Sequence, residues 1–411
     1  AELNVKQWRD PVGAAELAGA VAGIVACLEE ASGPQSQKRL MQWLEGLLES
    51  VEDLPYKGRA VANVFVFDLD AALGITSALE GPRGRLLDTT HSVIERLCQQ
   101  NPNDAQAARD LSVSQERLGD FNLRRGESGD ADRALEAYQQ SLDTRQRLYQ
   151  QNPNDAQAAR DLSVSHDRLG DFYLRRGESG DADRALEAFQ QSLDTRQRLN
   201  QQNPNDAQAA RDLSISLNKQ GDFYLRRGGS GDADRALEAY QKCHETLERL
   251  YQQNPNDAQA ARDLSVSHER LGDFYLRRGG SGDADRTLEA YQQSLEIDER
   301  LYHQNPNDAQ AARGLSVSLN KLGDFYLRRG GSGDADRALE AYQQSLDTRQ
   351  PLYQQNPNDA QAARDLSVSH ERLGDFYLRR GESGDADRAL EAYQQSLDTR
   401  QRLNQQNPND A

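Results

Sequence analysis

A segment of 51 residues recurs without insertion or deletion, and this repetition limits the fold more than any other feature of the chain. Six complete copies are present, and they begin at Asn101, Asn152, Asn203, Asn254, Asn305 and Asn356. A partial seventh copy begins at Asn407. A period of this length is typical of a solenoid, in which each unit packs only on its neighbours. The sequence therefore predicts a linear array and not one large globular core.

Each copy contains two stretches with helical periodicity. In the second copy, the first stretch runs to about Arg176, and Gly177 is expected to end it. Its apolar stripe is made of Leu162, His166, Leu169 and Tyr173. The apolar side of the second stretch is made of Ala182, Ala185, Leu186, Phe189, Leu193 and Leu199. Stripes at this spacing predict two amphipathic helices.

The helix starts and the small residues add detail to this hairpin. Asn154 and Gln157 have the spacing of a capping box at the start of the first helix. Asp181 or Asp183 is expected to cap the second helix, where a carboxylate also suits the helix dipole. Gly170, together with Ala185 and Ala188, predicts a close approach of the two helices.

These residues resemble the tetratricopeptide repeat family. The matching positions are Leu169, Gly170, Tyr173, Gly177, Ala185, Phe189, Ser192 and Leu193. The unit is longer than the usual one of about 34 residues, as in long-repeat bacterial members of the family. The resemblance implies that the first helices line a concave groove along which partners lie. We therefore predict an all-α fold, an α-solenoid of stacked antiparallel helical hairpins with an α-helical N-terminal cap.

The predicted organisation has four parts. Residues 1–58 form the N-terminal cap, residues 59–100 a degenerate repeat, residues 101–406 the six hairpins, and residues 407–411 the start of a seventh. The segment from Val64 to Asp70 resembles the nucleophile motif of haloacid dehalogenase-type phosphatases. Such an enzyme needs a parallel sheet and further acidic residues downstream, for which the repeats leave no room. We therefore predict a protein that is not an enzyme.

Composition excludes several classes of function. The net charge of −17 is spread through the copies and leaves no basic stripe, so a nucleic-acid partner is not expected. Cys27, Cys98 and Cys243 share no spacing that predicts disulfides or a zinc site. The longest apolar run, 17–28, is too short to span a membrane. We expect a soluble, cytoplasmic protein without catalytic residues, cofactor or metal.

The histidines of the copies fall at one repeated position. His166, His268 and His370 alternate there with Leu217 and Leu319. An apolar residue at the same place indicates a position in the packed interior. A role in pH sensing or metal binding is the weaker alternative.

A repeated set of polar residues on the first helices supplies the candidate groove. Acid, amide and guanidinium groups recur on what is predicted to be the exposed face, with Asp171 and Arg175 at the spacing of a favourable pair. Solvated charges of a helix face are the structural alternative to a partner-binding role. The candidates are Asp167, Asp171, Arg175, Asn218, Asp222, Arg226, Asp273, Arg277, Asn320, Asp324, Arg328, Asp375 and Arg379.

Three functions are consistent with these sequence features. The first is a scaffold that binds a partner protein or peptide along the groove, because a helical array exposes a long surface without one large core. The second is self-assembly into an oligomer or filament, because near-identical units can stack end to end. The third is the sensor or regulatory arm of a larger bacterial signalling or defence protein.

Overall fold

The chain is an all-α array of helical hairpins. The computed structural model describes residues 80–406, so the predictions for residues 1–79 and 407–411 lie outside the described part. The described residues form helices joined by short turns, without β-strands, which confirms the predicted fold class. The chain divides into two compact units, Ala1–Thr195 and Arg196–Ala411, and contacts are described within each unit separately.

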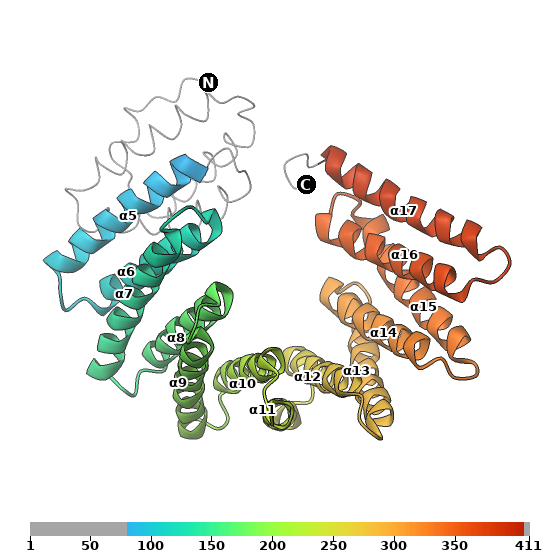
Figure 1. The fold of residues 1–411 in the computed structure, drawn as a ribbon, viewed down its shortest axis with the longest axis horizontal. Coiled ribbons are helices and arrows are strands. Elements are labelled where there is room, and N and C mark those ends of the chain that lie inside the picture. The colour runs from blue at the N-terminus through green and yellow to red at the C-terminus, as the bar shows by residue number, and fades with distance from the viewer. Residues whose placement is uncertain (1–79, 407–411) are drawn as a thin grey trace. The chain divides into compact units, whose positions relative to one another are not determined.

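Each 51-residue copy contributes two helices, and α5 precedes the first of them (Figure 1). The first helix of each copy has an even number and the second an odd number. The helices are α5 (Glu80–Gln100), α6 (Ala105–Arg125), α7 (Asp130–Gln151), α8 (Ala156–Arg176), α9 (Asp181–Gln202), α10 (Ala207–Arg227), α11 (Asp232–Gln253), α12 (Ala258–Arg278), α13 (Asp283–Gln304), α14 (Ala309–Arg329), α15 (Asp334–Gln355), α16 (Ala360–Arg380) and α17 (Asp385–Gln406).

An aspartate caps each first helix. In α8, Asp155 accepts hydrogen bonds from the backbone N–H groups of Gln157 at 2.9 Å and Ala158 at 3.3 Å. The predicted capping box between Asn154 and Gln157 is therefore wrong, since the side chain of Gln157 donates instead to Asp161. Gly177 ends α8 with a left-handed φ of 69°, as predicted, because only glycine takes this conformation without strain.

The second helix of each copy begins on a buried ion pair. In α15, Gly333 occupies the N-cap in a left-handed conformation and offers no side chain to cap the helix. Asp334 is the first helical residue, and its buried carboxylate accepts the backbone N–H of Gly331 at 2.8 Å and two hydrogen bonds from Arg329 at 2.6 and 2.8 Å. Asp181 does the same with Glu178 and Arg176 in α9. The expectation that Asp181 or Asp183 caps the helix is therefore wrong.

We call this unit the Asp–Arg clamp, and it recurs in every copy. The pairs are Asp130–Arg125, Asp181–Arg176, Asp232–Arg227, Asp283–Arg278, Asp334–Arg329 and Asp385–Arg380. The guanidinium also stacks on aromatic rings of its own helix, as Arg329 does over Phe325 and Tyr326 at 5.2 Å from each ring centroid. A planar cation that is both paired and stacked holds the turn between the two helices in one geometry.

The two helices of a hairpin meet where glycine faces an aromatic ring. In the fifth copy Tyr342 of α15 is buried against Gly323 of α14, where an added Cβ would lie 2.7 Å from the ring. Gly170 faces Phe189 in the same way, which confirms the predicted close approach. Tyr342 also contacts Phe376 of the next copy edge to face, with ring centroids 6.1 Å apart. The same ring therefore closes one hairpin and joins it to the next.

We predict that Gly323→Ala destabilises the fold by about 1–3 kcal/mol, because the methyl group would displace the Tyr342 ring from a filled interior. Urea unfolding followed by circular dichroism measures the change. Gln343→Ala at an exposed position of α15 is the control and should lie within about 0.5 kcal/mol of the parent protein. Equal effects of the two substitutions would contradict this packing.

The clamp also predicts the behaviour of the protein in acid. The hydrogen bonds from Arg329 hold the pKa of Asp334 at about 2, below its ordinary value of 3.8. A carboxyl whose pKa is lowered by folding stabilises the fold above its unfolded pKa and loses that contribution as the pH falls through the folded value. We therefore expect helicity to be lost between about pH 4 and pH 2.

The matched variants for this prediction are Asp334→Asn and Asp336→Asn. A neutral amide could not form the same ion pair with Arg329, so the first variant should be less stable at neutral pH and less sensitive to acid. Asp336 is exposed in the same turn, and its substitution should change little. A circular dichroism titration compares them, and identical acid transitions in all three proteins would contradict the role of the clamp.

Candidate partner-binding surface

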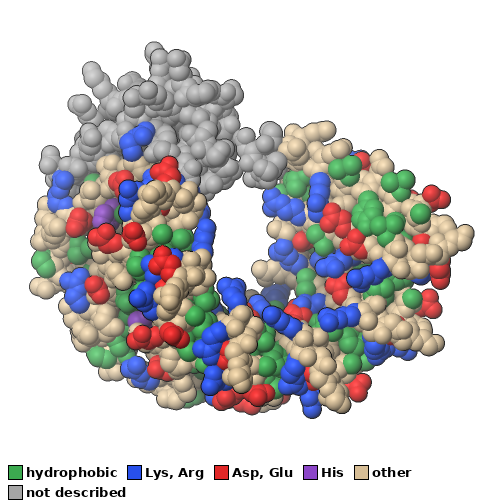
Figure 2. Space-filling model, in the orientation of Figure 1, with side chains coloured by type: hydrophobic (Ala, Val, Ile, Leu, Met, Phe, Trp, Pro, Cys, Tyr) green, Lys and Arg blue, Asp and Glu red, His purple; other side chains and the backbone are tan. Residues whose placement is uncertain are grey.

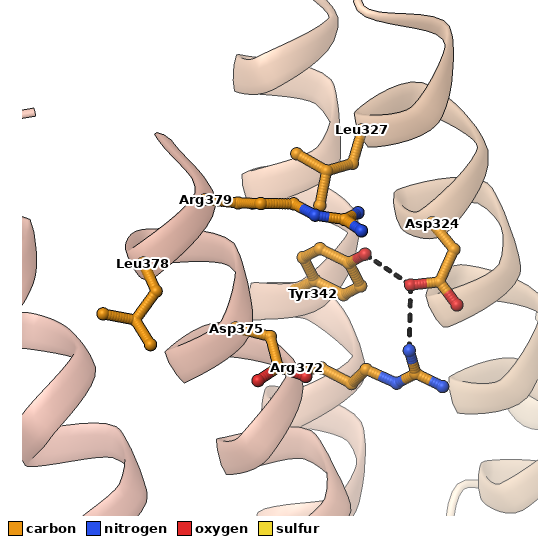
Figure 3. A pocket seen from close by; sticks show the side chains of 7 residues that line it. All are labelled: Asp324, Leu327, Tyr342, Arg372, Asp375, Leu378 and Arg379. Carbon is orange, nitrogen blue, oxygen red and sulfur yellow. Dashed lines mark hydrogen bonds and ion pairs between the residues drawn. The ribbon is translucent and has the colours of Figure 1, made fainter. Parts of the chain in front are cut away.

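A pocket between the fifth and sixth copies brings several of the predicted groove residues together. Its volume is about 410 Å³. It is lined by Asp324, Leu327, Tyr342, Arg372, Asp375, Leu378 and Arg379 (Figure 3). In Figure 3 the side chain of Arg379 extends toward Tyr342, and Leu378 points away from the Asp324 carboxylate. The pocket thus combines the Arg379 guanidinium, the apolar side chains of Leu327 and Leu378, and the Asp324 carboxylate, which is hydrogen-bonded to Tyr342.

The carboxylate of Asp324 is held by two neighbours. The hydroxyl of Tyr342 donates to Asp324 Oδ1 at 2.6 Å, and Arg372 of the next copy donates to the same oxygen at 3.1 Å. Burial of its ring, followed by the hydrogen bond to Asp324, raises the pKa of Tyr342 far above its ordinary value. The tyrosine therefore stays a hydrogen-bond donor, and the carboxylate links two successive copies.

The same arrangement, which we call the Tyr–Asp–cation tie, recurs along the array. Tyr240 and Arg270 contact Asp222 at 2.5 and 3.5 Å. In the next copies Asp273 accepts from Tyr291 at 2.6 Å and from Lys321 at 2.7 Å. Within the first unit, Tyr138 lies 2.7 Å and Arg168 3.7 Å from Asp120. The offsets along the chain are constant, because identical copies repeat identical contacts.

Several aspartates of the predicted groove thus form hydrogen bonds within the fold. Asp222, Asp273 and Asp324 are between 40% and 46% exposed, and their oxygens are engaged in the ties. The favourable Asp–Arg pair expected four residues apart does not form at Asp222, Asp273 or Asp324 in the described part of the second unit. In these three copies the carboxylate accepts a hydrogen bond from a tyrosine hydroxyl. Asp171 and Asp375 are exposed.

Three other predicted residues do not lie on the exposed face. Asp167 and Asn320 are buried, and Asn218 is partly buried. They belong to a polar layer between the first and second helices, at the position that Glu116 occupies in the first copy. There Glu116 forms a buried pair with Arg145 at 2.5 Å. Periodicity alone did not separate this inward position from the exposed one, which lies one helical turn further along.

The arginines of the predicted groove lie on the exposed face of the first helices. Arg175, Arg226, Arg277, Arg328 and Arg379 are all exposed. No hydrogen bond or ion pair within residues 196–406 engages Arg226, Arg277, Arg328 or Arg379, which we call the arginine row. Figure 2 shows lysine and arginine side chains gathered beside α10 and α12, on the side away from α11. These guanidinium groups therefore lie beside partly exposed aspartates of the same face, without a hydrogen bond or ion pair in the described part of the second unit.

Part of this surface was not predicted from the sequence. Tyr342, Arg372 and the wall residues Leu327 and Leu378 were not among the predicted groove residues. A signal was available for the ties, since in the ties described above a tyrosine follows the aspartate by 18 residues and an arginine or lysine follows it by 48.

The repeated histidine position faces the interior, as expected. His166 is buried, and His268 and His370 are partly buried. Burial lowers the pKa of His166 to about 4, so its imidazole is neutral at physiological pH. Within residues 80–406, no three His, Cys, Asp or Glu side chains are grouped so that they could hold a metal ion. In the same part of the chain no helix has the length and apolar character that a membrane crossing requires.

No family model and no curated protein matches the chain. Among solved structures it is similar to a circular tandem repeat protein, with 17% identity over 96% of this chain and 98% of the other and a TM-score of 0.41. It is also similar to the S. pombe nuclear import adaptor Nro1, with 12% identity over 72% of this chain and 94% of the other and a TM-score of 0.41. A MamA double mutant has 15% identity over 59% of this chain and 97% of the other, with a TM-score of 0.32. These values are too low to indicate a shared function. The hairpins themselves make the chain an α-helical repeat protein.

We predict that Tyr342→Phe destabilises the fifth and sixth copies by about 1–3 kcal/mol, because a charged acceptor loses its donor. Tyr353→Phe is the control, since no hydrogen bond engages that hydroxyl within the described residues. In an Asp324→Asn background the effect of Tyr342→Phe should shrink, and chemical denaturation of the four proteins measures this coupling. Additive effects would contradict the tie.

Proposed function

We propose that the chain is a non-enzymatic scaffold that binds an acidic, extended segment of a partner protein along its first helices. The observation that carries this proposal is the arginine row, in which each copy from the third to the sixth presents one exposed guanidinium without a partner among residues 196–406. Such groups bind carboxylates in a fixed, often bidentate geometry. The net charge of −17 belongs to the whole chain and does not describe this face.

The walls between the arginines indicate a second requirement of the partner. Leu327 and Leu378 line the pocket beside Arg379, and Leu378 is 59% exposed. An apolar side chain placed there would remove leucine surface from water while a neighbouring acidic residue reaches the arginine. The proposed ligand therefore alternates acidic and apolar side chains, with positions that recur from copy to copy.

We also propose a repeat family and a cellular compartment for this chain. The hairpins are an elongated variant of the tetratricopeptide repeat, on the residue pattern given above. The protein works in the cytoplasm, a compartment that suits the free thiols of Cys98 and Cys243. Nucleic acid and membranes are not among the proposed partners.

Fluorescence anisotropy with a labelled peptide of glutamate and leucine residues separated by glycine tests the scaffold proposal. The protein in which Arg277, Arg328 and Arg379 are changed to Ala should bind roughly tenfold more weakly, because exposed charge pairs contribute about 0.2–1 kcal/mol each. Added salt should weaken binding to the parent protein. A peptide with lysine in place of glutamate should not bind.

The matched control removes the same charge from the second helices. Arg249, Arg300 and Arg402 are exposed on α11, α13 and α17, and their substitution by Ala should leave binding of the peptide unchanged. Equal weakening by the two triple variants would mean that binding follows net charge and not the arginine row. Absence of binding by the parent protein would contradict the proposed ligand.

Self-assembly is the second candidate, and one observation favours it. Leu390 and Leu397 of α17 are 64% and 51% exposed, whereas the equivalent Leu339 and Leu346 of α15 pack on a core that includes residues of α16. A second copy of the chain could cover this face. Light scattering over a range of concentrations, with Leu390→Ser and Leu397→Ser as the variant, tests it, and a constant monomeric mass would exclude it.

A further inference from the structure

In the first and sixth copies, the polar layer between the two helices joins a guanidinium to a carboxylate. In the first copy Arg145 donates to Glu116 at 2.5 and 3.1 Å, and both side chains are nearly enclosed. In the sixth copy Arg400 lies 2.9 Å from Glu371. Burial raises the pKa of Glu116, and the charge of Arg145 opposes that rise.

The fourth copy has a carboxylate at this position and a second carboxyl group in place of the guanidinium. It keeps the carboxylate, Glu269 of α12, but has Asp298 of α13 where the first copy has Arg145. Asp298 is only 3% exposed. The next copy changes as well, since Gly314 stands where the other copies have Asp, and a Cβ at Gly314 would lie 3.0 Å from Asp298 Oδ1. The junction of the fourth and fifth copies is therefore packed around two carboxyl groups.

Three serine hydroxyl groups surround these two carboxyl groups. Ser265 Oγ lies 2.8 Å from Asp298 Oδ2 and 2.9 Å from Ser294 Oγ. Ser318 Oγ lies 2.6 Å from Asp298 Oδ2, 3.1 Å from Glu269 Oε1 and 2.9 Å from Ser294 Oγ. Ser318 has one hydrogen and lies within hydrogen-bond distance of both carboxyl groups, so a proton on either carboxyl group would add a donor to this cluster.

The cations that face the pair are already engaged by other carboxylates. Arg262 of α12 pairs with Asp308, and Lys321 of α14 contacts both carboxylate oxygens of Asp273 at 2.7 Å. Asp273 adds a further negative charge from α12, and α13 contributes Asp298 itself. The site thus lacks a cation of its own among the described residues. Burial accordingly raises the pKa of Glu269 to about 7 and also raises the pKa of Asp298.

We propose that the partly buried Glu269 and the buried Asp298 form a proton-binding site, and that loss of its proton loosens the junction between the fourth and fifth copies. The folded pKa of Glu269 lies above its ordinary value of 4.5, so the stabilisation is complete below that value and is lost as the pH rises through about 7. The direction is opposite to that of the Asp–Arg clamps, which lose their contribution in acid. The array therefore contains a junction that weakens when the pH rises above neutrality.

Hydrogen exchange of the full chain, followed by mass spectrometry and corrected for intrinsic rates, tests this site. Between about pH 6 and pH 8 the protection of α13 and α14 should fall about tenfold, which is the change expected for a proton bound with a pKa near 7. Peptides from α16 and α17, where Glu371 has Arg400 beside it, should show no such change. Equal changes in both regions would overturn the proposal.

Two variants distinguish the effect of protonation from the effect of side-chain packing. Glu269→Gln preserves the shape of the side chain and cannot titrate, so the protection of α13 and α14 should no longer depend on pH. If that variant fails to fold, Asp298→Arg combined with Gly314→Asp recreates the pairing of the first copy and should have the same effect. Carbon-13 NMR of the Glu269 carboxyl group in the parent protein gives a direct reading. A midpoint near 4.5 would overturn the proposal.

Discussion

The buried pair between the first aspartate of each second helix and the last arginine of each first helix is the interaction on which the array depends. It fixes the turn in which Asp334 meets Arg329, and the stacked rings of Phe325 and Tyr326 fix the guanidinium. An identical turn in every copy places identical helix faces at a regular interval. A repeating surface therefore follows from one local geometry.

Among the polar residues of the first helices, the aspartates stabilise the fold and the arginines are the groups proposed to bind a partner. The aspartates join one copy to the next through tyrosine and a cation, as Asp324 does with Tyr342 and Arg372. The arginines of the row, such as Arg379, take no part in this and stay exposed. The helices fix the spacing of these donors, and each exposed arginine side chain loses rotamer freedom when it binds.

Repetition made the fold predictable, but it could not separate the roles of neighbouring polar residues. The apolar stripes and Gly177 were sufficient to place the helices of each hairpin. Asp167 and Asn320 were assigned to the exposed face because they are polar, and they are buried in a layer where polar groups find partners between helices. The cap was displaced by one residue, from Asn154 to Asp155, since both side chains can accept the same hydrogen bonds. Glu269 and Asp298 belong to one copy, and Ser318 of the next copy contacts both, which the repeat pattern does not predict.

Chemical modification of arginine, read by mass spectrometry, shows whether a bound peptide covers the first helices. Phenylglyoxal reacts with exposed guanidinium groups, so the rates at Arg226, Arg277, Arg328 and Arg379 report on the first-helix face. The account predicts that a bound acidic peptide slows modification of these four residues and leaves Arg249 and Arg402 of the second helices unchanged. Protection of the second helices, or of neither face, would contradict it.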